Sequence, residues 1–187
     1  MRLFLAIELP EEIRTHLVSV RDELKRHITR GSFPRDENLH ITLKFLGDVE
    51  AAEVSKLSES MHLVRAGGPI NLSAQDIECF PERGPIRVVA AQFGGDLAGM
   101  KSVHQSVEQR CRHLGFERET RAYRPHVTLV RARPTLDPGF RKIADSFAAQ
   151  FPGPSFDVDE FSLVESRLRA EGSEYNTLGR FRFIEAS

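Results

Sequence analysis

The feature that most constrains the fold is an order of apolar segments that runs through the chain twice. In the first half, strand-like runs and helical spacing alternate at residues 3–9, 11–24, 39–46, 54–64 and 70–80. In the second half the same alternation returns at residues 86–93, 97–114, 127–130, 140–147 and 156–164. Adding 86 to a position in the first half reaches the matching segment, so that Leu3 corresponds to Val89 and Ile70 to Phe156. We therefore predict an α+β fold with two pseudo-symmetric βαβαβ lobes and mostly antiparallel sheets flanking a central cleft.

The chain length fits one bilobal domain over residues 1–187. Its 187 residues are 40% hydrophobic, which supports one shared core, whereas each half alone is too small to be a confident independent folder. We expect a first repeat at about 1–80, a second at about 86–165 and a C-terminal strand at about 180–185. The alternative is an ordinary α+β domain whose periodicity is accidental, because no long sequence identity links the halves.

Two histidines occupy equivalent places in this repeat. Residues 40–43 read His-Ile-Thr-Leu and residues 126–129 read His-Val-Thr-Leu. On a strand, residues i and i+2 point to the same face, so each histidine should stand beside its threonine while the apolar residues face a core. A single strand histidine is usually a satisfied structural residue, but a matched pair favours a functional site.

The chemistry of such a pair suits an anion held between the two histidines. Imidazole titrates near neutral pH, so one ring can accept a proton while the other donates one. The hydroxyls of Thr42 and Thr128 can donate hydrogen bonds to a phosphate between the rings. The sequence has no phosphate-binding glycine loop, dinucleotide fingerprint, zinc-protease motif or ligand spacing for a metal near either histidine. We therefore expect no metal and no cofactor.

Positive charge is concentrated around the second histidine. The chain as a whole has 26 basic and 27 acidic residues, so no global field favours nucleic acid. Between residues 110 and 133, however, the basic residues are Arg110, Arg112, Arg118, Arg121, Arg124, Arg131 and Arg133, against the two acidic residues Glu117 and Glu119. A solvated charged face is the usual explanation, but the position beside His126 favours attraction of phosphate. Arg131 is the foremost candidate for direct contact, and Lys44 is a second candidate because strand parity places it on the face of His40.

Other features point to an intracellular monomer. Cys79 and Cys111 lack disulfide-framework or zinc spacing and are expected to be reduced structural thiols. The apolar start of the chain is too short for a signal peptide, and no segment could span a bilayer. We expect a cytoplasmic protein that does not bind membranes, and a monomer because no long exposed apolar stripe requires a second subunit.

The two motifs and their surroundings resemble a known family. The segments NLHITLKFLG at 38–47 and RPHVTLVR at 124–131, the opening at residues 2–10 and the segment at 164–168 are similar to the RNA 2′,3′-cyclic phosphodiesterases of the two-histidine phosphoesterase superfamily, originally called 2′-5′ RNA ligases. The resemblance spans nearly the whole chain. Relatives often carry a tryptophan shortly before the first motif, where this chain has Phe33, so any stacking on a base there could differ.

The resemblance implies an activity and roles for the residues. The family hydrolyses RNA 2′,3′-cyclic phosphate ends to 2′-phosphomonoesters without metal, which makes RNA ends or nucleotide cyclic phosphates the expected partners. Carried over, His40 is the proton donor to the departing 3′ oxygen and His126 the proton acceptor that activates water, with Thr42 and Thr128 holding phosphate oxygens. Three alternatives remain: a small substrate such as an ADP-ribose cyclic phosphate, a non-catalytic RNA-end-binding module, and reversible 2′-5′ ligation as a side reaction.

Overall fold

The fold is built from eleven strands and four α-helices within the described residues. The computed structural model describes residues 1–170 and 172–185. The helices are α1 (Glu11–Lys25), α2 (Val54–Met61), α3 (Leu97–His113) and α4 (Phe140–Asp145). The strands are β1 (Arg2–Glu8), β2 (Gly31–Ser32), β3 (His40–Asp48), β4 (Arg65–Ala66), β5 (Ile70–Phe80), β6 (Ile86–Gly95), β7 (His126–Leu136), β8 (Ser155–Val158), β9 (Glu160–Arg169), β10 (Gly172–Arg182) and β11 (Ile184–Glu185).

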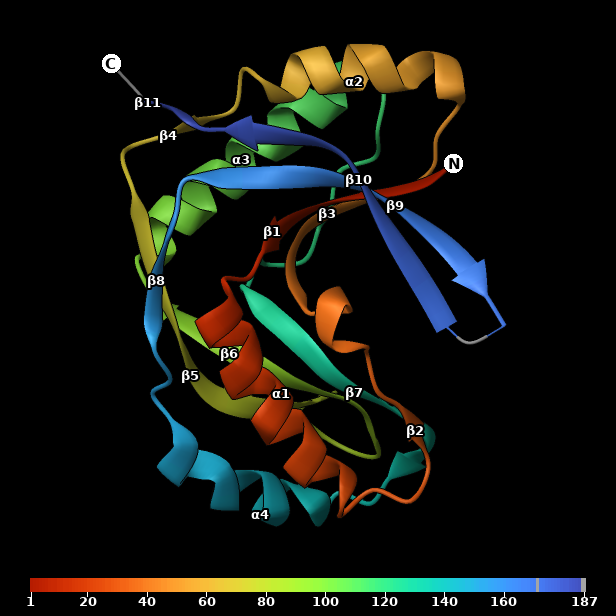
Figure 1. The fold of residues 1–187 in the computed structure, drawn as a ribbon, viewed down its shortest axis with the longest axis vertical. Coiled ribbons are helices and arrows are strands. Elements are labelled where there is room, and N and C mark those ends of the chain that lie inside the picture. The colour runs from red at the N-terminus through yellow and green to blue at the C-terminus, as the bar shows by residue number, and fades with distance from the viewer. Residues whose placement is uncertain (171, 186–187) are drawn as a thin grey trace.

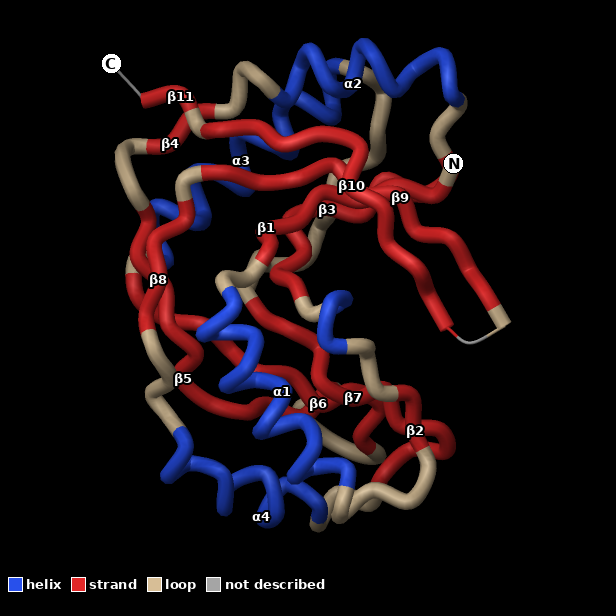
Figure 2. The backbone as a smooth tube through the Cα atoms, in the orientation of Figure 1, coloured by secondary structure: helices blue, strands red, loops and turns tan. Residues whose placement is uncertain are grey.

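Two antiparallel sheets form the two lobes, which confirms the predicted α+β class. The first sheet has the order β10-β9-β1-β3, and the second has the order β2-β7-β6-β5-β8. Helices α2 and α3 lie with the first sheet, and α1 and α4 lie with the second (Figures 1 and 2). Strands β4 and β11 form a separate parallel pair beside α3.

The two halves of the chain are interleaved between the lobes. Strand β5 belongs to the first half, yet it pairs with β6 in the second sheet, and β9 of the second half pairs with β1 in the first sheet. The helices cross in the same way, because α1 contacts β7 while α3 contacts β3. Each lobe therefore contains elements of both repeats, so neither half could close a lobe on its own.

The pairing register of the strands changes part of the predicted correspondence between the two halves. Strand β3 corresponds to β7 with the predicted offset of 86, but Ala6 pairs with Thr42 whereas Ala90 pairs with Thr128. Strand β1 is thus matched to β6 by an offset of 84, so the correspondence of Leu3 with Val89 is wrong. The second half has two more residues between the paired strands, and periodicity alone did not reveal this insertion.

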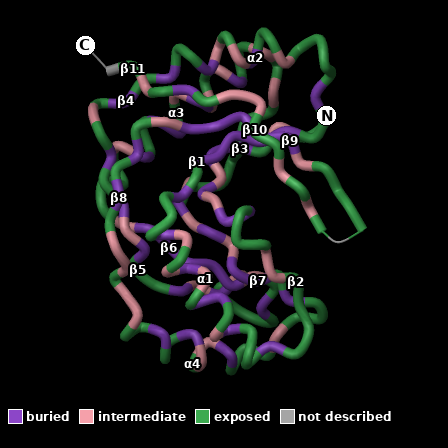
Figure 3. The backbone as a smooth tube through the Cα atoms, viewed as in Figure 1, coloured by how far each residue is buried: buried purple, intermediate pink, exposed green. Residues whose placement is uncertain are grey.

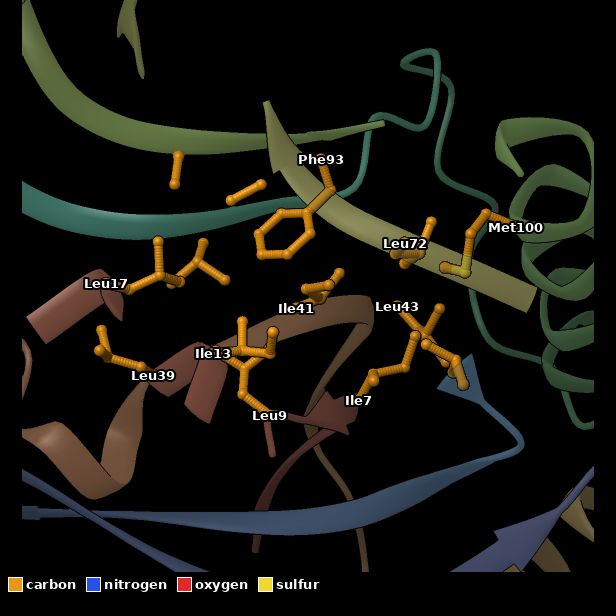
Figure 4. Close-up of a cluster of buried hydrophobic side chains, with 14 of the residues drawn as sticks. Ile7, Leu9, Ile13, Leu17, Leu39, Ile41, Leu43, Leu72, Phe93 and Met100 are labelled. Carbon is orange, nitrogen blue, oxygen red and sulfur yellow. The ribbon is translucent and has the colours of Figure 1, made fainter. Parts of the chain in front are cut away.

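One continuous core joins the lobes and fixes the direction of the histidine strands. Ile13 and Leu17 of α1, Ile41 of β3 and Phe93 of β6 are buried in the same cluster (Figure 4). Buried segments run through the centre of both lobes, and the far end of the β9–β10 hairpin is exposed (Figure 3). Burial of an aliphatic side chain contributes about 1.5–3 kcal/mol, so burial of Ile41 strongly favours the orientation in which its two neighbours face outward.

Three predicted segments differ from the structure. The run at 156–164 was expected as one strand, but it divides at Asp159 into β8 of one sheet and β9 of the other. Periodicity within a segment cannot report which sheet each part joins. The helix expected to extend to Val64 ends at Met61, and the predicted tail strand is the end of β10 followed by β11. Within residues 1–170 and 172–185, no helix has the length and apolar character needed to cross a bilayer.

Candidate active site

The two motif histidines begin equivalent strands and share the same local geometry. His40 Nδ1 lies 2.7 Å from the carbonyl oxygen of Asn38, and His126 Nδ1 lies 2.9 Å from the carbonyl oxygen of Arg124. A carbonyl only accepts hydrogen bonds, so each Nδ1 carries the proton and donates it. This leaves Nε2 of each neutral ring as the proton-accepting atom. Strands β3 and β7 also contact each other, which brings the two strands with histidines together at the junction of the lobes.

The threonines stand where strand parity predicts. The Oγ1 of Thr42 lies 3.0 Å from His40 Nε2, to which its hydroxyl can donate while the ring is neutral. Thr42, Thr128 and His126 line one cleft of about 650 Å³ between the sheets. The side chain of His40 is half-buried beside this cleft. The structure thus brings both sequence motifs to one place.

A β-bulge in the second histidine strand, β7, brings Arg131 to the same cleft. The pairing of β6 with β7 skips Leu129, so that Ala90 is opposite Thr128 and Val88 is opposite Arg131. Without the extra residue, Arg131 would lie on the face opposite to His126, because the two are an odd number of positions apart in the strand. With the bulge, its side chain is exposed in the cleft.

The equivalent bulge in β3 corrects the prediction for Lys44. Leu5 pairs with Lys44 and Ala6 with Thr42, which skips Leu43. Lys44 therefore shares the core-facing side of Leu5 rather than the face of His40, so the predicted facing of Lys44 is wrong. Although Lys44 borders the cleft, its Nζ donates to Glu108 Oε1 at 2.7 Å and to the Glu117 carbonyl at 2.7 Å. These bonds anchor the loop after α3, so Lys44 acts as a structural support in this geometry.

The pKa of His40 is influenced by charged groups on β7. Burial lowers the pKa of its imidazole below the ordinary value of 6.5, although the bond to the Asn38 carbonyl raises it. The positive charges of Arg131 and His126 lower the pKa of His40 further. Both groups lie on β7, so these charge effects on His40 come from the strand that β3 contacts. A phosphate bound in the cleft would reverse the repulsion and favour protonated imidazole.

The loop between α3 and β7 carries much of the predicted basic segment into the cleft. Of the arginines between residues 110 and 133, those that line the cleft are Arg118, Arg121, Arg124 and Arg131. Arg124 also lies 3.6 Å from a carboxylate oxygen of Glu78. The acidic residues Glu117 and Glu119 line the same cleft and offset part of the positive charge.

Sequence reasoning missed the aromatic residues around the histidines. The ring of Phe4 lies 4.9 Å from that of His40, and the ring of Tyr175 lies 5.4 Å from it. Phe80 lies 6.2 Å from His126, and Phe45 is 66% exposed at the cleft. Parity along β1 could have indicated Phe4, but the others depend on bulges and on strand pairings between distant segments.

Phe33, the aromatic residue considered for base stacking, takes a different place. It packs against the hydrophobic core, and Lys25 Nζ lies 5.5 Å from its ring centre. Within the described part of the chain, no group of three or more His, Cys, Asp or Glu side chains is arranged to hold a metal ion. The expected independence from metal stays a prediction.

Two antiparallel sheets that each supply a His-x-Thr strand to a shared cleft define a two-histidine phosphoesterase. The family model described as LigT like Phosphoesterase matches residues 7–90 and 98–175. The chain belongs to this family of LigT-like phosphoesterases.

Similar proteins cover the full length of the chain. A protein of Methanocaldococcus jannaschii named RNA 2′,3′-cyclic phosphodiesterase is 34% identical over 95% of this chain and 98% of its own length. A crystal structure of Escherichia coli LigT complexed with 3′-AMP has a TM-score of 0.74 at 26% identity, covering 98% of each chain. A Thermus thermophilus structure has a TM-score of 0.81 and covers 100% of both chains, and at 24% identity it supports the fold.

Proposed function

We propose that this protein hydrolyses RNA 2′,3′-cyclic phosphate ends to 2′-phosphomonoesters, without a metal, through His40 and His126. The single observation that carries the proposal is the pair of imidazoles beside one cleft, each with Nδ1 bound to the carbonyl two residues earlier. Family membership and the name of the M. jannaschii relative support the same activity. The 3′-AMP complex of the E. coli relative supports a ribonucleotide phosphate as the kind of ligand that fits such a cleft.

In the proposed reaction, each histidine acts through Nε2. His126 Nε2 accepts a proton from water as the water oxygen attacks phosphorus, and protonated His40 donates its Nε2 proton to the departing 3′ oxygen. The bond between phosphorus and the 3′ oxygen breaks, which leaves the phosphate on the 2′ oxygen. The carbonyls of Asn38 and Arg124 hold the Nδ1 protons during this exchange, so that each ring keeps its orientation.

Binding of the phosphate also favours the protonated form of His40. Burial, Arg131 and His126 hold the pKa of His40 below its ordinary value, so the neutral ring is favoured. An anionic phosphate near the ring raises that pKa and increases the fraction of the acid form. Thr42, Thr128 and Arg131 are the proposed donors to the phosphate oxygens, where charge increases in the transition state. A ribose 5′-hydroxyl in place of water would form a 2′-5′ linkage by the same step.

The arginines of the loop after α3 favour RNA over a small cyclic nucleotide. Arg118 and Arg121 line the cleft in addition to Arg131 and can contact phosphates other than the one that reacts. A cyclic mononucleotide or an ADP-ribose cyclic phosphate offers fewer such phosphates. Substitution of Arg118 and Arg121 by glutamine should therefore lower kcat/KM for a cyclic-ended oligonucleotide more than for the cyclic mononucleotide. Equal losses on both substrates would favour the small substrate.

The test of the proposed function is hydrolysis of cyclic-phosphate-ended RNA in the presence of EDTA. We expect turnover to persist in EDTA, the product to carry a 2′-phosphate, and either His40→Ala or His126→Ala to reduce kcat/KM by about 10²–10⁴-fold. Tight binding of the RNA end without turnover would identify a binding module instead. A 3′-phosphate product would reverse the proposed orientation of the leaving group.

A further inference from the structure

The two histidines have matching carbonyl bonds but different surroundings. The hairpin formed by β9 and β10 belongs to the first sheet (Figure 1), and its Tyr175 packs beside His40. On the other lobe, β8 occupies the corresponding edge, where it pairs with β5 over residues 155–158. The pseudo-symmetry of the site is therefore broken on the side of His40.

The first contact between this hairpin and the site runs through Asn38. The side chain of Asn38, which is 8% exposed, donates from Nδ2 to the carbonyl oxygen of Ser173 on β10 at 2.7 Å. The backbone carbonyl of the same residue accepts the proton of His40 Nδ1 at 2.7 Å. One buried residue thus links the hairpin to the atom that fixes the tautomer of His40. Because a buried amide without a hydrogen-bond partner is strongly disfavoured, the link restrains the segment.

The second contact is aromatic. The ring of Tyr175 on β10 meets that of His40 at 77° with the ring centres 5.4 Å apart, and it meets Phe4 at 67° with a separation of 5.0 Å. Phe4 in turn lies 4.9 Å from His40. The imidazole is therefore enclosed by rings from β1 and β10, while Asn38 holds its Nδ1 edge. These contacts leave the ring few alternative orientations.

The charged groups facing His40 come from both sheets. Arg131 and His126 approach from β7. Glu8 is opposite His40 in the pairing of β1 with β3, but its carboxylate accepts hydrogen bonds from Ser162, Thr177 and Arg180. The carboxylate of Glu8 is therefore occupied by the hairpin strands, so it competes less for the imidazole.

We propose that Asn38 and Tyr175 are positioning residues for His40, through which the β9–β10 hairpin holds the imidazole in its Nδ1–H tautomer with Nε2 available to the cleft. This inference rests on the proposed function, because it gives His40 a part in the reaction. It goes beyond that function by making contacts from a hairpin distant in sequence, at Ser173 and Tyr175, a requirement for the orientation of the ring.

The direct test is nitrogen NMR of His40 in the ligand-free protein, with the signal assigned by its loss in His40→Gln. We expect the wild-type ring to be the Nδ1–H tautomer with a pKa below 6.5. Asn38→Ala should mix the tautomers, and Tyr175→Leu should shift the pKa of His40 upward because the ring is less enclosed. Tyr175→Phe should behave as wild type, since it keeps the aromatic contact. Asn71→Ala is the control, because Asn71 makes its side-chain hydrogen bond to Asp157 and neither residue lines the cleft.

Kinetics give the second readout. Asn38→Ala should lower kcat by about 10–100-fold with little change in KM, because a displaced acid affects the transition state more than binding. Folding of each variant is checked by urea denaturation, and Asn38→Ser replaces Asn38→Ala if the alanine variant is unfolded. The proposal is overturned if folded variants at both positions keep the tautomer, the pKa of His40 and kcat of the wild type. If the wild type lacks phosphodiesterase activity, the proposed function fails, whereas the NMR result still decides whether the hairpin positions His40.

Discussion

The buried ammonium of Lys44 provides a quantitative test of the site's architecture. Lys44 is 5% exposed, and its Nζ donates to Glu108 Oε1 and to the Glu117 carbonyl, each at 2.7 Å. The side chain of Glu108 is only 11% exposed, so it cannot recover full hydration when its partner is removed. Lys44→Met keeps the length of the side chain and deletes the charge. Breaking a buried ion pair from one side costs about 3–5 kcal/mol.

Urea denaturation and thermal unfolding measure this cost. For a chain of this size, a loss of about 3–5 kcal/mol corresponds to a decrease in Tm of about 6–20 °C. The double variant Lys44→Met, Glu108→Leu removes both charges and should recover much of the lost stability, because no unpaired charge then stays buried. If Lys44 instead served mainly to bind phosphate, Lys44→Met would raise KM while the free energy of unfolding changed by less than about 1 kcal/mol, which would refute the structural role.

The loss of stability in Lys44→Met should depend on pH in a definite direction. His104 Nε2 lies 3.8 Å from Glu108 Oε1. Burial lowers the pKa of His104 in the native protein, and the charge of Lys44 lowers it further, against the effect of Glu108. Removal of Lys44 should raise the pKa of His104, so that protonated His104 can pair with Glu108 at low pH. The stability deficit of Lys44→Met should therefore be smaller near about pH 6 than near about pH 8. An equal deficit at both values would contradict this coupling.

Three further predictions follow from the cleft and the buried histidines. Thr42→Val and Thr128→Val should each lower kcat/KM by up to about 10²-fold in steady-state assays, because a donor to the phosphate is lost while the volume is kept; unchanged kinetics would exclude the hydroxyls. In NMR titrations, inorganic phosphate should raise the pKa of His40, which burial, Arg131 and His126 otherwise hold below its ordinary value; an unchanged pKa of His40 would contradict a phosphate beside this ring. Burial also lowers the pKa of His16 in the native protein, so the unfolded chain binds an additional proton as the pH falls below 6.5. His16→Leu should therefore reduce the loss of stability in acid, measured by urea denaturation; an unchanged dependence of the free energy of unfolding on pH would contradict a contribution from His16.

The sequence predicted the class of fold because local periodicity is preserved in the structure. The alternation around Ile41 and Val127 buries the apolar residues of each motif, which sets both histidines on the opposite face. It could not predict that β5 and β9 exchange sheets, since pairing partners are chosen by contacts across the whole core rather than by the pattern within one strand.

The candidate site shows the same division between local and long-range information. The residues of the two motifs were identified from spacing, whereas the bulges at Leu43 and Leu129 reversed the facing of the residues directly after them, up to the next irregularity in each pairing. This reversal explains why strict parity misplaced Lys44. Asn38 and Tyr175 have no recognisable local pattern, because their contacts to the histidine depend on a hairpin formed by the end of the chain.

The most direct measurement of the central claim is a double-mutant cycle on the two histidines. Cyclic-ended RNA is hydrolysed in EDTA by the wild type, His40→Gln, His126→Gln and the double variant, and kcat is compared for all four. If both imidazoles act on one phosphorus in one step, the double variant should be about as slow as either single variant, because removing one partner already disables the pair. Losses that multiply, or turnover that survives both substitutions, would contradict the account.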